Sequence, residues 1–509
     1  MKNFDFDNLF VLDLANNHQG NLKHGLKVIK ECSKMVHKHN IRAAIKFQFR
    51  QYETFIHPDH KKNSNNKHIP RFLSTELKKE EWQTLFNAVK DEGLLTMCTP
   101  FDNESVPIIV DMGFDIIKVA SCSAKDWPLL EDISFSSLPV IASTGGLKIS
   151  DIDNLVSFFD HRGVAHALMH CVSIYPIPQD DFHLNHIDTL KKRYKNTTIG
   201  WSTHEDQDDS VPVQIAMAKG AKMFERHVGL DTDEVKLNTY SSRPEQLDNW
   251  FKAYRYSEIL CGSKTDRPIT KIEQDSLDGL QRGMFAKKDI EKGKLLSLND
   301  VYFAMPFVPG QLSSEHWKLK SIHSLKTIKK DSPIFPNEVK QKSESNYKVL
   351  KDAIHEVKAM LNNASITLNS DFNIEFSHHH GIENFREVGA LIIDCVNREY
   401  CKKLIVVLPG QKHPSHFHKR KEETFQSLSG DFEYILDGRK KVLKPGETAL
   451  VQPGVWHEFW SKEGCIVEEV STTHYNDDSI YSDKEINDLE RSQRKTVVKN
   501  WGRFELVEN

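Results

Sequence analysis

The stretch DIIKVASCS, residues 115–123, is a short apolar run with one lysine inside it and small polar residues directly after it. Seven other short apolar runs lie between residues 10 and 228: FVLDLA, AAIKFQ, LLTMCT, PVIAST, HALMHCV, TTIGWS and KMFERHV. Each of the eight is typical of a buried strand. Most intervals carry apolar residues at steps of three and four, as in HGLKVIKECSKMVHKH, which indicates amphipathic helices.

Eight strand-and-helix units in succession predict an α/β protein whose first domain, residues 1–265, is a (β/α)8 TIM barrel. The last helix of the barrel fits within PEQLDNWFKAYRYSEIL. The alternative is an open doubly wound sheet, but no glycine-rich phosphate loop follows the first run. In a barrel the active site lies at the carboxyl ends of the strands, so the residues there are the first candidates for a site.

Polar residues of unusual kinds stand at these strand ends. Lys46 and Lys118 lie inside apolar runs, where an ammonium group is costly to bury unless an anion meets it. Amides, hydroxyls and imidazoles occupy the other ends: Asn16, Asn17, His18, Gln48, Thr99, Ser121, Ser143, Thr144, Ser173, Tyr175, Ser202, His204 and His227. Two lysines and several hydroxyls at one mouth predict a substrate that carries phosphate or carboxylate.

Two β-rich regions are expected after the barrel. Residues 280–340 combine short apolar runs with a D-I-x-x-G turn, which predicts a small module. The lysine- and serine-rich connection VKQKSESNYK leads to residues 345–485, whose apolar runs are separated by Gly, Pro and Asp turns. This pattern predicts an all-β barrel or sandwich. Residues 486–509 are charged and are expected to form a C-terminal tail.

Composition favours a small polar ligand over nucleic acid or a membrane. The 509 residues include 68 Lys and Arg against 72 Asp and Glu, for a net charge of −4, with both signs interspersed. The eight cysteines form no C-x-x-C pair, as expected of reduced thiols. The start, MKNFDFDNLF, lacks the features of a signal peptide, and no apolar run approaches membrane-spanning length. We expect a cytoplasmic protein.

Eight motifs in order carry a family resemblance: LDLANNHQG, IKFQ, CTPFDNESV, IIKVASCS, IASTGG, HCVSIYPIP, IGWSTHE and FERHVGLD. Together they resemble the sialic acid synthase family, whose members join phosphoenolpyruvate to an N-acetylated hexosamine and release phosphate. The resemblance implies phosphoenolpyruvate and an aldose, N-acetylmannosamine or a modified hexosamine, as substrates of a nonulosonic acid synthase. Residues 280–340 look like the antifreeze-like (SAF) domain that caps the partner barrel of a homodimer in that family.

The resemblance also assigns roles to strand-end residues. The family's phosphoenolpyruvate site is matched by Lys46, Thr99, Lys118, Ser121, Ser143, Ser173 and Ser202, and we add Gln48 and Tyr175 as substrate-binding candidates. His204 and His227 match two histidines that bind Mn²⁺ or Mg²⁺, which would polarise the acceptor aldehyde for attack by C3 of phosphoenolpyruvate. Water would then add at C2, and phosphate would leave by C–O cleavage. The catalytic candidates are Asp13, Lys46, Lys118, His204 and His227.

The sugar side departs from the family. Asp13 replaces a glutamate and would act as an acid-base group at one methylene less reach. Ser123 also stands where a glutamate is expected, and Leu237 and Asn238 replace an Asp-His pair. The arginine that relatives supply from the antifreeze-like domain is not evident around AMPFVPGQL. These departures predict the same reaction class on an altered sugar, or a weakened enzyme.

The last region resembles a cupin. Its turn pattern is matched by Gly410, Gly430, Gly446, Pro453 and Gly454, and its metal ligands by His416, His418, Glu423 and His457. Three imidazoles and a carboxylate suit Mn, Fe, Ni or Zn. Sugar-isomerase cupins also resemble this stretch, so the cupin could be an isomerase or epimerase that prepares the acceptor. Two alternatives stay open: a dimerisation or stability module, or a whole chain that is a metal-dependent sugar-binding protein derived from a synthase.

Overall fold

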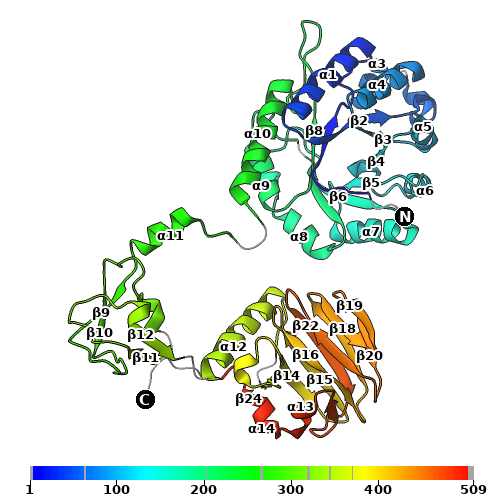
Figure 1. The fold of residues 1–509 in the computed structure, drawn as a ribbon. Coiled ribbons are helices and arrows are strands. Elements are labelled where there is room, and N and C mark those ends of the chain that lie inside the picture. The colour runs from blue at the N-terminus through cyan, green and yellow to red at the C-terminus, as the bar shows by residue number, and fades with distance from the viewer. Residues whose placement is uncertain are drawn as a thin grey trace. The chain divides into compact units, whose positions relative to one another are not determined.

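The computed structural model describes residues 4–61, 65–202, 204–263, 267–317, 321–342, 346–368 and 371–502. The chain forms two compact units, Met1–Arg267 and Pro268–Asn509, which are described separately below. Figure 1 shows the barrel of the first unit and the β-rich parts of the second. None of the described helices is both long and apolar enough to span a membrane.

The first unit is a closed barrel of eight parallel strands that neighbour one another in chain order (Figure 1). The strands are β1 (Leu9–Asp13), β2 (Arg42–Phe49), β3 (Leu95–Pro100), β4 (Ile116–Val119), β5 (Val140–Ser143), β6 (His166–Cys171), β7 (Thr198–Ser202) and β8 (Met223–His227). Each coincides with one of the eight predicted runs. The predicted TIM barrel is therefore confirmed, and the open sheet is excluded because β1 pairs with both β2 and β8.

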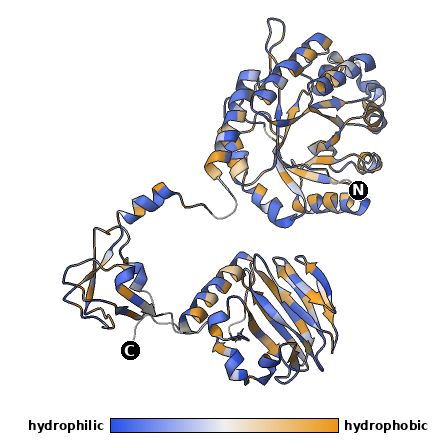
Figure 2. Ribbon diagram, in the orientation of Figure 1, coloured by the Kyte–Doolittle hydropathy of each residue, from blue (hydrophilic) through white to orange (hydrophobic). Residues whose placement is uncertain are grey.

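Helices surround these strands. They are α1 (Leu22–Lys38), α2 (Tyr52–Phe55), α3 (His68–Ser74), α4 (Lys79–Asp91), α5 (Ser105–Met112), α6 (Trp127–Phe135), α7 (Ile149–Arg162), α8 (His186–Arg193), α9 (Val211–Ala218) and α10 (Pro244–Cys261). The helices carry both hydrophilic and hydrophobic residues in Figure 2, as amphipathic helices do. The helix predicted to close the barrel is α10.

Strand alternation decides which side chains enter the barrel. In β1, Phe10 and Leu12 pack in the layer shared with the helices, whereas Leu9 and Val11 pack in a separate cluster inside the barrel. Because successive side chains of a strand point to opposite faces, Asp13 continues the inward series at the carboxyl end. The inward residues of the other strands, such as Ala44 in β2, fill the same interior cluster. An apolar plug thus closes the barrel beneath its polar mouth.

The second unit begins with a helix, α11 (Lys271–Asp278), and a small β-rich part. Its strands are β9 (Gly283–Ala286), β10 (Val301–Ala304), β11 (Ser321–Ser324) and β12 (Val339–Lys342), which form two antiparallel pairs, β9 with β10 and β11 with β12. A core of its own includes Met284, Ile290, Leu312 and Ile334. A compact β-rich module was predicted for residues 280–340.

The rest of the second unit contains a helix, α12 (Asn346–Asn363), and two antiparallel sheets of seven and five strands. The strands are β13 (Asn373–Ser377), β14 (Ala390–Asn397), β15 (Tyr400–Val407), β16 (Lys412–His418), β17 (Glu423–Ser429), β18 (Phe432–Leu436), β19 (Arg439–Leu443), β20 (Thr448–Val451), β21 (His457–Trp460), β22 (Cys465–Thr472), β23 (Ser479–Tyr481) and β24 (Lys495–Lys499). Two short helices, α13 (Lys484–Asp488) and α14 (Arg491–Arg494), precede β24. The predicted all-β region is confirmed.

The C-terminal segment corrects one prediction. Residues 486–509 were expected to form a tail outside the all-β domain, but β24 pairs with β13 along its full length. The segment also buries Ile486, and Lys495 Nζ lies 2.5 Å from Glu375 Oε1. The strand KTVVK has only two adjacent apolar residues between its lysines, too short a run to indicate a strand from the sequence. The domain therefore extends to at least Lys499.

Candidate functional site

The structure brings the twelve predicted barrel residues to one cavity of about 660 Å³ at the carboxyl ends of the strands. We call it the mouth cavity. Its predicted lining residues are Asp13, Lys46, Gln48, Thr99, Lys118, Ser121, Ser143, Ser173, Tyr175, Ser202, His204 and His227. Their convergence follows from the barrel itself, because the inward positions at the ends of parallel strands share one edge.

Lys46 and Lys118 form the floor of the mouth cavity together with two carboxylates. Lys46 Nζ lies 2.6 Å from Glu225 Oε1 and 3.0 Å from Asp13 Oδ2, and Lys118 Nζ lies 3.6 Å from Glu225 Oε2. Burial opposes the charge of Lys46, but Asp13 and Glu225 raise its pKa above the ordinary value. Burial lowers the pKa of Lys118, and Glu225 offsets this only in part. The fold thus supplies part of the neutralisation that the sequence analysis expected of a substrate.

Sequence reasoning missed Glu225. Its carboxyl is buried, and Lys118 and Lys46 hold its pKa below the ordinary value although burial alone would raise it. A signal was available, because Glu225 stands two residues before His227 in β8 and therefore shares the inward face. An acidic residue within an apolar run is as costly to bury as a lysine, so Glu225 could have been predicted to pair with Lys46 or Lys118.

Three serines surround a glycine turn on the other side of the floor. The Gly145 backbone N–H donates to Ser121 Oγ at 3.0 Å, and Lys118 Nζ donates to Ser143 Oγ at 2.5 Å. A Cβ on Gly145 would lie 2.7 Å from Ser121 Oγ and closer still to Ser173 Oγ. Gly145 is therefore required for the close approach of these hydroxyls. The result is a cradle of hydroxyl groups beside an ammonium group, which suits an anion.

His204 and His227 lie side by side at the ends of β7 and β8. Their ring centroids are 5.5 Å apart, and His227 Nε2 lies 3.5 Å from Asp13 Oδ2. His204 Nδ1 contacts the Val172 carbonyl at 3.0 Å, which leaves Nε2 as the available metal-binding atom. Burial and neighbouring His227 lower the pKa of His204 to about 3, so its imidazole is neutral at pH 7. Among the described residues these two imidazoles and Asp13 do not form a compact group of three ligands, so the pair of imidazoles is the candidate for holding a divalent cation.

Another part of the mouth cavity combines Asn17 and Asn238, which the sequence analysis named without a role, with Tyr240, which it missed. Asn17, Asn238 and Tyr240 line the mouth cavity, and Asn238 Nδ2 donates to Asn17 Oδ1 at 3.3 Å. Within the described parts of the chain, Ser123 and Leu237 do not line it. Of the positions that depart from the family, Asp13 and Asn238 therefore face the mouth cavity. Ser123 is instead buried in the turn after β4.

One wall of the mouth cavity is cationic and was also missed. Arg50, at the end of β2, and Lys67, His68 and Arg71, around α3, all line it. The Arg50 guanidinium lies between two rings, 4.1 Å from the Phe72 centroid and 3.7 Å from the Phe101 centroid. The segment between β2 and α4 contains many charged and polar residues and no apolar period, so the sequence alone did not place it over the barrel.

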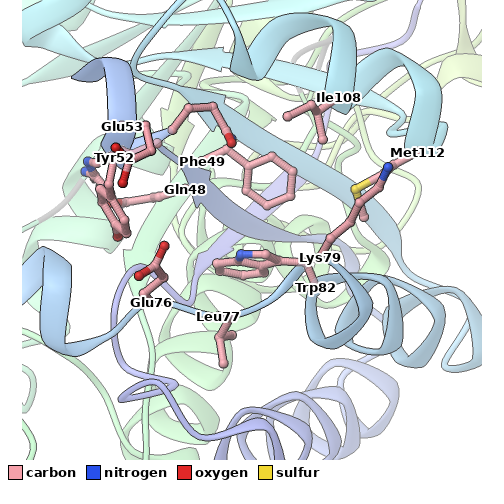
Figure 3. Close-up of a pocket in the computed structure, with 12 residues that line it drawn as sticks. Gln48, Phe49, Tyr52, Glu53, Glu76, Leu77, Lys79, Trp82, Ile108 and Met112 are labelled. Atoms are coloured by element: carbon pink, nitrogen blue, oxygen red, sulfur yellow. Dashed lines mark hydrogen bonds between the residues drawn. The ribbon is translucent and has the colours of Figure 1, made fainter. Parts of the chain in front are cut away.

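A smaller cavity of about 220 Å³ adjoins the mouth cavity. Figure 3 shows Tyr52, Glu53 and Glu76 on one side of it and the apolar Trp82 and Met112 on the other. Gln48 and Arg50 line both cavities. Of the twelve predicted barrel residues, only Gln48 lines the smaller one, so the predicted chemistry belongs to the mouth cavity.

The second candidate site lies inside the C-terminal sheets. Ligand atoms of His416, His418 and His457 all lie within 4.8 Å of one another, and all three residues are buried. Glu423 completes the predicted set, with Oε1 2.9 Å from His457 Nε2 and Oε2 3.5 Å from His418 Nε2. The structure thus brings together all four predicted ligands. The arrangement fits a transition metal or zinc, whose identity the ligand types leave open.

The neighbours of these ligands fix their orientation. His416 Nδ1 contacts the Pro414 carbonyl at 3.0 Å, and His457 Nδ1 contacts the Val455 carbonyl at 3.1 Å. These contacts leave Nε2 of each ring for a metal ion. Lys421, which sequence reasoning missed, lies 2.5 Å from Glu423 Oε2 and 2.9 Å from Glu469 Oε1. Burial opposes the Lys421 charge, yet the two carboxylates raise its pKa above the ordinary value.

Comparisons with known proteins cover both units. The NeuB family matches residues 38–266, and the cupin domain matches residues 403–467. An uncharacterized protein of Methanocaldococcus jannaschii is 32% identical over 292 residues, which span 57% of this chain and 82% of that one. N-acetylneuraminate-9-phosphate synthase of Drosophila melanogaster is 23% identical over 364 residues, 65% of this chain and 96% of that one.

One solved structure is more similar in sequence. The crystal structure of a "putative spore coat polysaccharide biosynthesis protein E" from Chromobacterium violaceum is 41% identical, with a TM-score of 0.64. The match covers 65% of this chain and 99% of that one. The similarity to that structure therefore accounts for nearly the whole of that protein and leaves about a third of this chain without a counterpart in it.

Proposed function

Because the chain belongs to the NeuB family, we propose that its barrel condenses phosphoenolpyruvate with an aldose to form a nonulosonic acid and inorganic phosphate. One observation carries the proposal: two buried ammonium groups, a hydroxyl cradle and two imidazoles share a single cavity. That set provides for an anionic donor and for a carbonyl acceptor in the same space. The family resemblance supports this pairing.

In this proposal the floor of the mouth cavity binds phosphoenolpyruvate. Lys46 and Lys118 act as positioned charges rather than as proton donors, because Glu225 and the substrate phosphate stabilise their charged forms. Ser121, Ser143 and Ser173 donate hydrogen bonds from the cradle around Gly145. Thr99 at the end of β3 and Ser202 at the end of β7 line the same cavity and complete the proposed donor site.

The acceptor aldehyde is placed at the two histidines. His204 and His227 would hold Mn²⁺ or Mg²⁺, and a cation there polarises a carbonyl. C3 of phosphoenolpyruvate attacks C1 of the aldose, water adds at C2, and phosphate leaves with the bridging oxygen. Asp13 lies 3.0 Å from Lys46 Nζ and 3.5 Å from His227 Nε2, so it stands between donor and acceptor. It is the proposed acid-base group for the sugar and the water.

We further propose a homodimer in which the residue 280–340 module acts as the antifreeze-like cap. Support comes from apolar side chains exposed near the end of α10 and around α11, which an isolated chain leaves in water. They include Ile259 at 77% exposure, Ile272 at 83% and Leu280 at 69%. Sedimentation of the full chain should give twice the monomer mass. The Ile272→Lys variant should sediment with a mass closer to that of the monomer.

The cupin is proposed to be an accessory metal site. The cavity beside its ligands measures about 40 Å³, against about 660 Å³ for the mouth cavity. The small cavity leaves less room for a sugar than for a metal ion. This observation favours the stability or accessory role over the isomerase role, which needs a sugar beside the metal.

Turnover assays test the proposal. Full-length protein with Mn²⁺ and phosphoenolpyruvate is given N-acetylmannosamine and its 6-deoxy and diacetamido analogues, and products are identified by mass spectrometry. We expect one nonulosonic acid and one phosphate per phosphoenolpyruvate consumed with at least one sugar, abolished by Lys118→Ala and by His227→Ala. Lys30→Gln, an exposed cation on α1, is the matched control.

Two results would contradict the proposal in different ways. Sugar binding without phosphate release would identify a sugar-binding protein. Sugar turnover without phosphoenolpyruvate, lost in the His416→Ala, Glu423→Ala double variant, would identify a cupin isomerase.

A further inference from the structure

Two hydrogen bonds connect Arg50 to Asp13 through Gln48. Arg50 Nη2 donates to Gln48 Oε1 at 3.0 Å, and Gln48 Nε2 donates to Asp13 Oδ2 at 3.2 Å. A longer contact of 3.5 Å joins the same Nε2 to Asp13 Oδ1. All three residues line the mouth cavity. Arg50, which the sequence analysis did not assign, is therefore connected to the proposed acid-base group through one intervening side chain.

The chemistry of the two outer groups fixes the direction of this chain. A guanidinium has only hydrogen-bond donors, and a carboxylate has only acceptors. The Gln48 amide between them must therefore turn its carbonyl oxygen to Arg50 and its NH₂ group to Asp13. A flipped amide would place N–H against N–H on one side and oxygen against oxygen on the other, and both bonds would be lost. Arg50 thus decides that Gln48 donates to Asp13.

Arg50 is itself held in place by aromatic rings. Its guanidinium lies 4.1 Å from the Phe72 ring centroid and 3.7 Å from the Phe101 centroid. Burial lowers the Arg50 pKa to about 10, which keeps the group charged at neutral pH. A planar cation between two rings has little freedom to turn, so its bond to Gln48 keeps a fixed direction.

The Asp13 carboxylate has several neighbours that set its orientation. Oδ1 accepts from the Ala15 backbone N–H at 2.9 Å. Oδ2 lies 3.0 Å from Lys46 Nζ and 3.5 Å from His227 Nε2. Gln48 adds a further donor to Oδ2. Without that donor, Oδ2 would be held by Lys46 and His227 alone, and the carboxylate would settle in a different orientation.

Resting on the proposed function, we propose that Arg50 is a positioning residue, which orients the Gln48 amide so that the amide holds the Asp13 carboxylate between donor and acceptor. Arg50 itself contacts neither substrate. Its removal should therefore lower kcat, because small displacements of a reacting group slow catalysis. The Michaelis constants of both substrates should stay near their original values.

Two competing explanations make different predictions. If Arg50 binds a substrate directly, its removal should raise the KM of that substrate. If Arg50 only fills the space between Phe72 and Phe101, Arg50→Met should keep full activity, because methionine keeps an unbranched side chain that can pack against both rings.

A double-mutant cycle on the full-length, Mn²⁺-loaded protein tests the proposal. Turnover of phosphoenolpyruvate with an accepted aldose is measured for Arg50→Met, Gln48→Leu and the double variant. Each single change should lower kcat by about tenfold, as the loss of one hydrogen bond to a charged group implies. Arg50→Met should leave both KM values within twofold. In the Gln48→Leu background, Arg50→Met should lower kcat no further, because Arg50 then has no amide to orient.

Two further variants make the result specific. Arg50→Lys keeps a cation that can only donate, so it should retain more of kcat than Arg50→Met does. Lys30→Gln removes a cation of the same unit outside the mouth cavity and should change neither kcat nor KM.

Three results with an active enzyme overturn the proposal: losses in kcat that multiply in the double variant, a raised KM in Arg50→Met, or full activity in Arg50→Met. Absence of turnover in the unmodified protein would instead remove the proposed function. Urea unfolding of Arg50→Met, Asp13→Asn and their double variant then decides whether the chain exists. Effects on the unfolding constant that depart from additivity by at least about twofold would support it, and additive effects would overturn it.

Discussion

The barrel and the cupin each bury a cluster of charges, and the two clusters have opposite polarity. In the barrel, Lys46 and Lys118 are paired with Asp13 and Glu225, and Arg50 and Arg71 line the same cavity. In the cupin one ammonium group, that of Lys421, lies between the carboxylates of Glu423 and Glu469. The barrel cluster opens into a cavity of about 660 Å³, and the cupin cluster borders one of about 40 Å³.

The difference indicates which ligand each site is built to receive. A buried charge requires a partner, so a site in which cations outnumber carboxylates, as they do once Arg50 and Arg71 are counted, favours an anion. A site with surplus carboxylates and neutral imidazoles is completed by a cation. We therefore propose that the barrel receives an anionic substrate and that the cupin receives a metal ion.

The largest effect is expected when the central group of the barrel cluster is neutralised. Glu225→Gln leaves the buried Lys118 without its carboxylate and Lys46 with Asp13 alone, and should lower the free energy of unfolding by about 3–5 kcal/mol. Glu469→Gln leaves Lys421 paired with Glu423 and should lower it by about 1–3 kcal/mol. Urea unfolding of each variant in the presence of a chelator measures both values. Equal losses would show that the polarity of the clusters has no energetic consequence.

A smaller free-energy change, but a clear functional one, is expected for the lysines. Lys118→Ala removes a charge beside the proposed phosphate site and should lower kcat/KM for phosphoenolpyruvate by about 10²–10³-fold. Lys421→Ala removes an equally buried lysine from the cupin and should leave that constant within twofold. A large loss of phosphoenolpyruvate turnover in Lys421→Ala would contradict the assignment of the chemistry to the barrel.

Metal addition should separate the two sites by stability. Four ligands with fixed orientation in the cupin should raise the free energy of unfolding of the metal-free protein by about 2.7 kcal/mol at a metal concentration of 100 times Kd. His416→Ala should abolish most of this gain, whereas His227→Ala should preserve it. Differential scanning calorimetry with and without Zn²⁺ or Mn²⁺ gives the comparison. A stability gain that depends on His227 and not on His416 would show that the barrel, and not the cupin, binds the added metal ion.

The smallest effect concerns acid stability. The His204 pKa is about 3 in the folded protein against 6.5 as the ordinary value, so below pH 6.5 the unfolded state binds the proton more readily. The free energy of unfolding should therefore decrease as the pH is lowered. Between pH 7 and pH 5, His204 alone should account for a decrease of about 2 kcal/mol. His204→Asn should flatten the profile of the metal-free protein between pH 7 and pH 5. An unchanged slope would mean that His204 is not held neutral.

Much of the fold and of the barrel site could be predicted from the sequence. The same apolar runs that indicate the strands also indicate which polar residues stand at the strand ends. The runs that predicted strands also placed Lys46, Lys118 and His227 at inward positions, and a closed barrel brings such positions together. The same rule was not applied to Glu225, although it shares the inward face with His227. Strand alternation could not predict the positions of Arg50 and Arg71, because they belong to connecting segments whose path depends on tertiary contacts.

The cupin shows the same division. His416, His418, Glu423 and His457 follow a known turn pattern, and the structure brings them together. Lys421 lies within that pattern but has no metal-binding chemistry, so its role emerged only from its distances to Glu423 and Glu469. The edge strand β24 was missed because it pairs with β13, more than 110 residues earlier, and local sequence cannot reveal such pairing.

Cleavage of labelled phosphoenolpyruvate shows whether the barrel carries out the proposed condensation. The substrate carries ¹⁸O in the oxygen that joins C2 to phosphorus, and the reaction contains full-length protein, Mn²⁺ and an accepted aldose. The account predicts that the label is recovered in inorganic phosphate, because water supplies the new oxygen at C2 and the C–O bond breaks. Label retained in pyruvate or in the sugar acid would show P–O cleavage and would contradict the proposed condensation in the barrel.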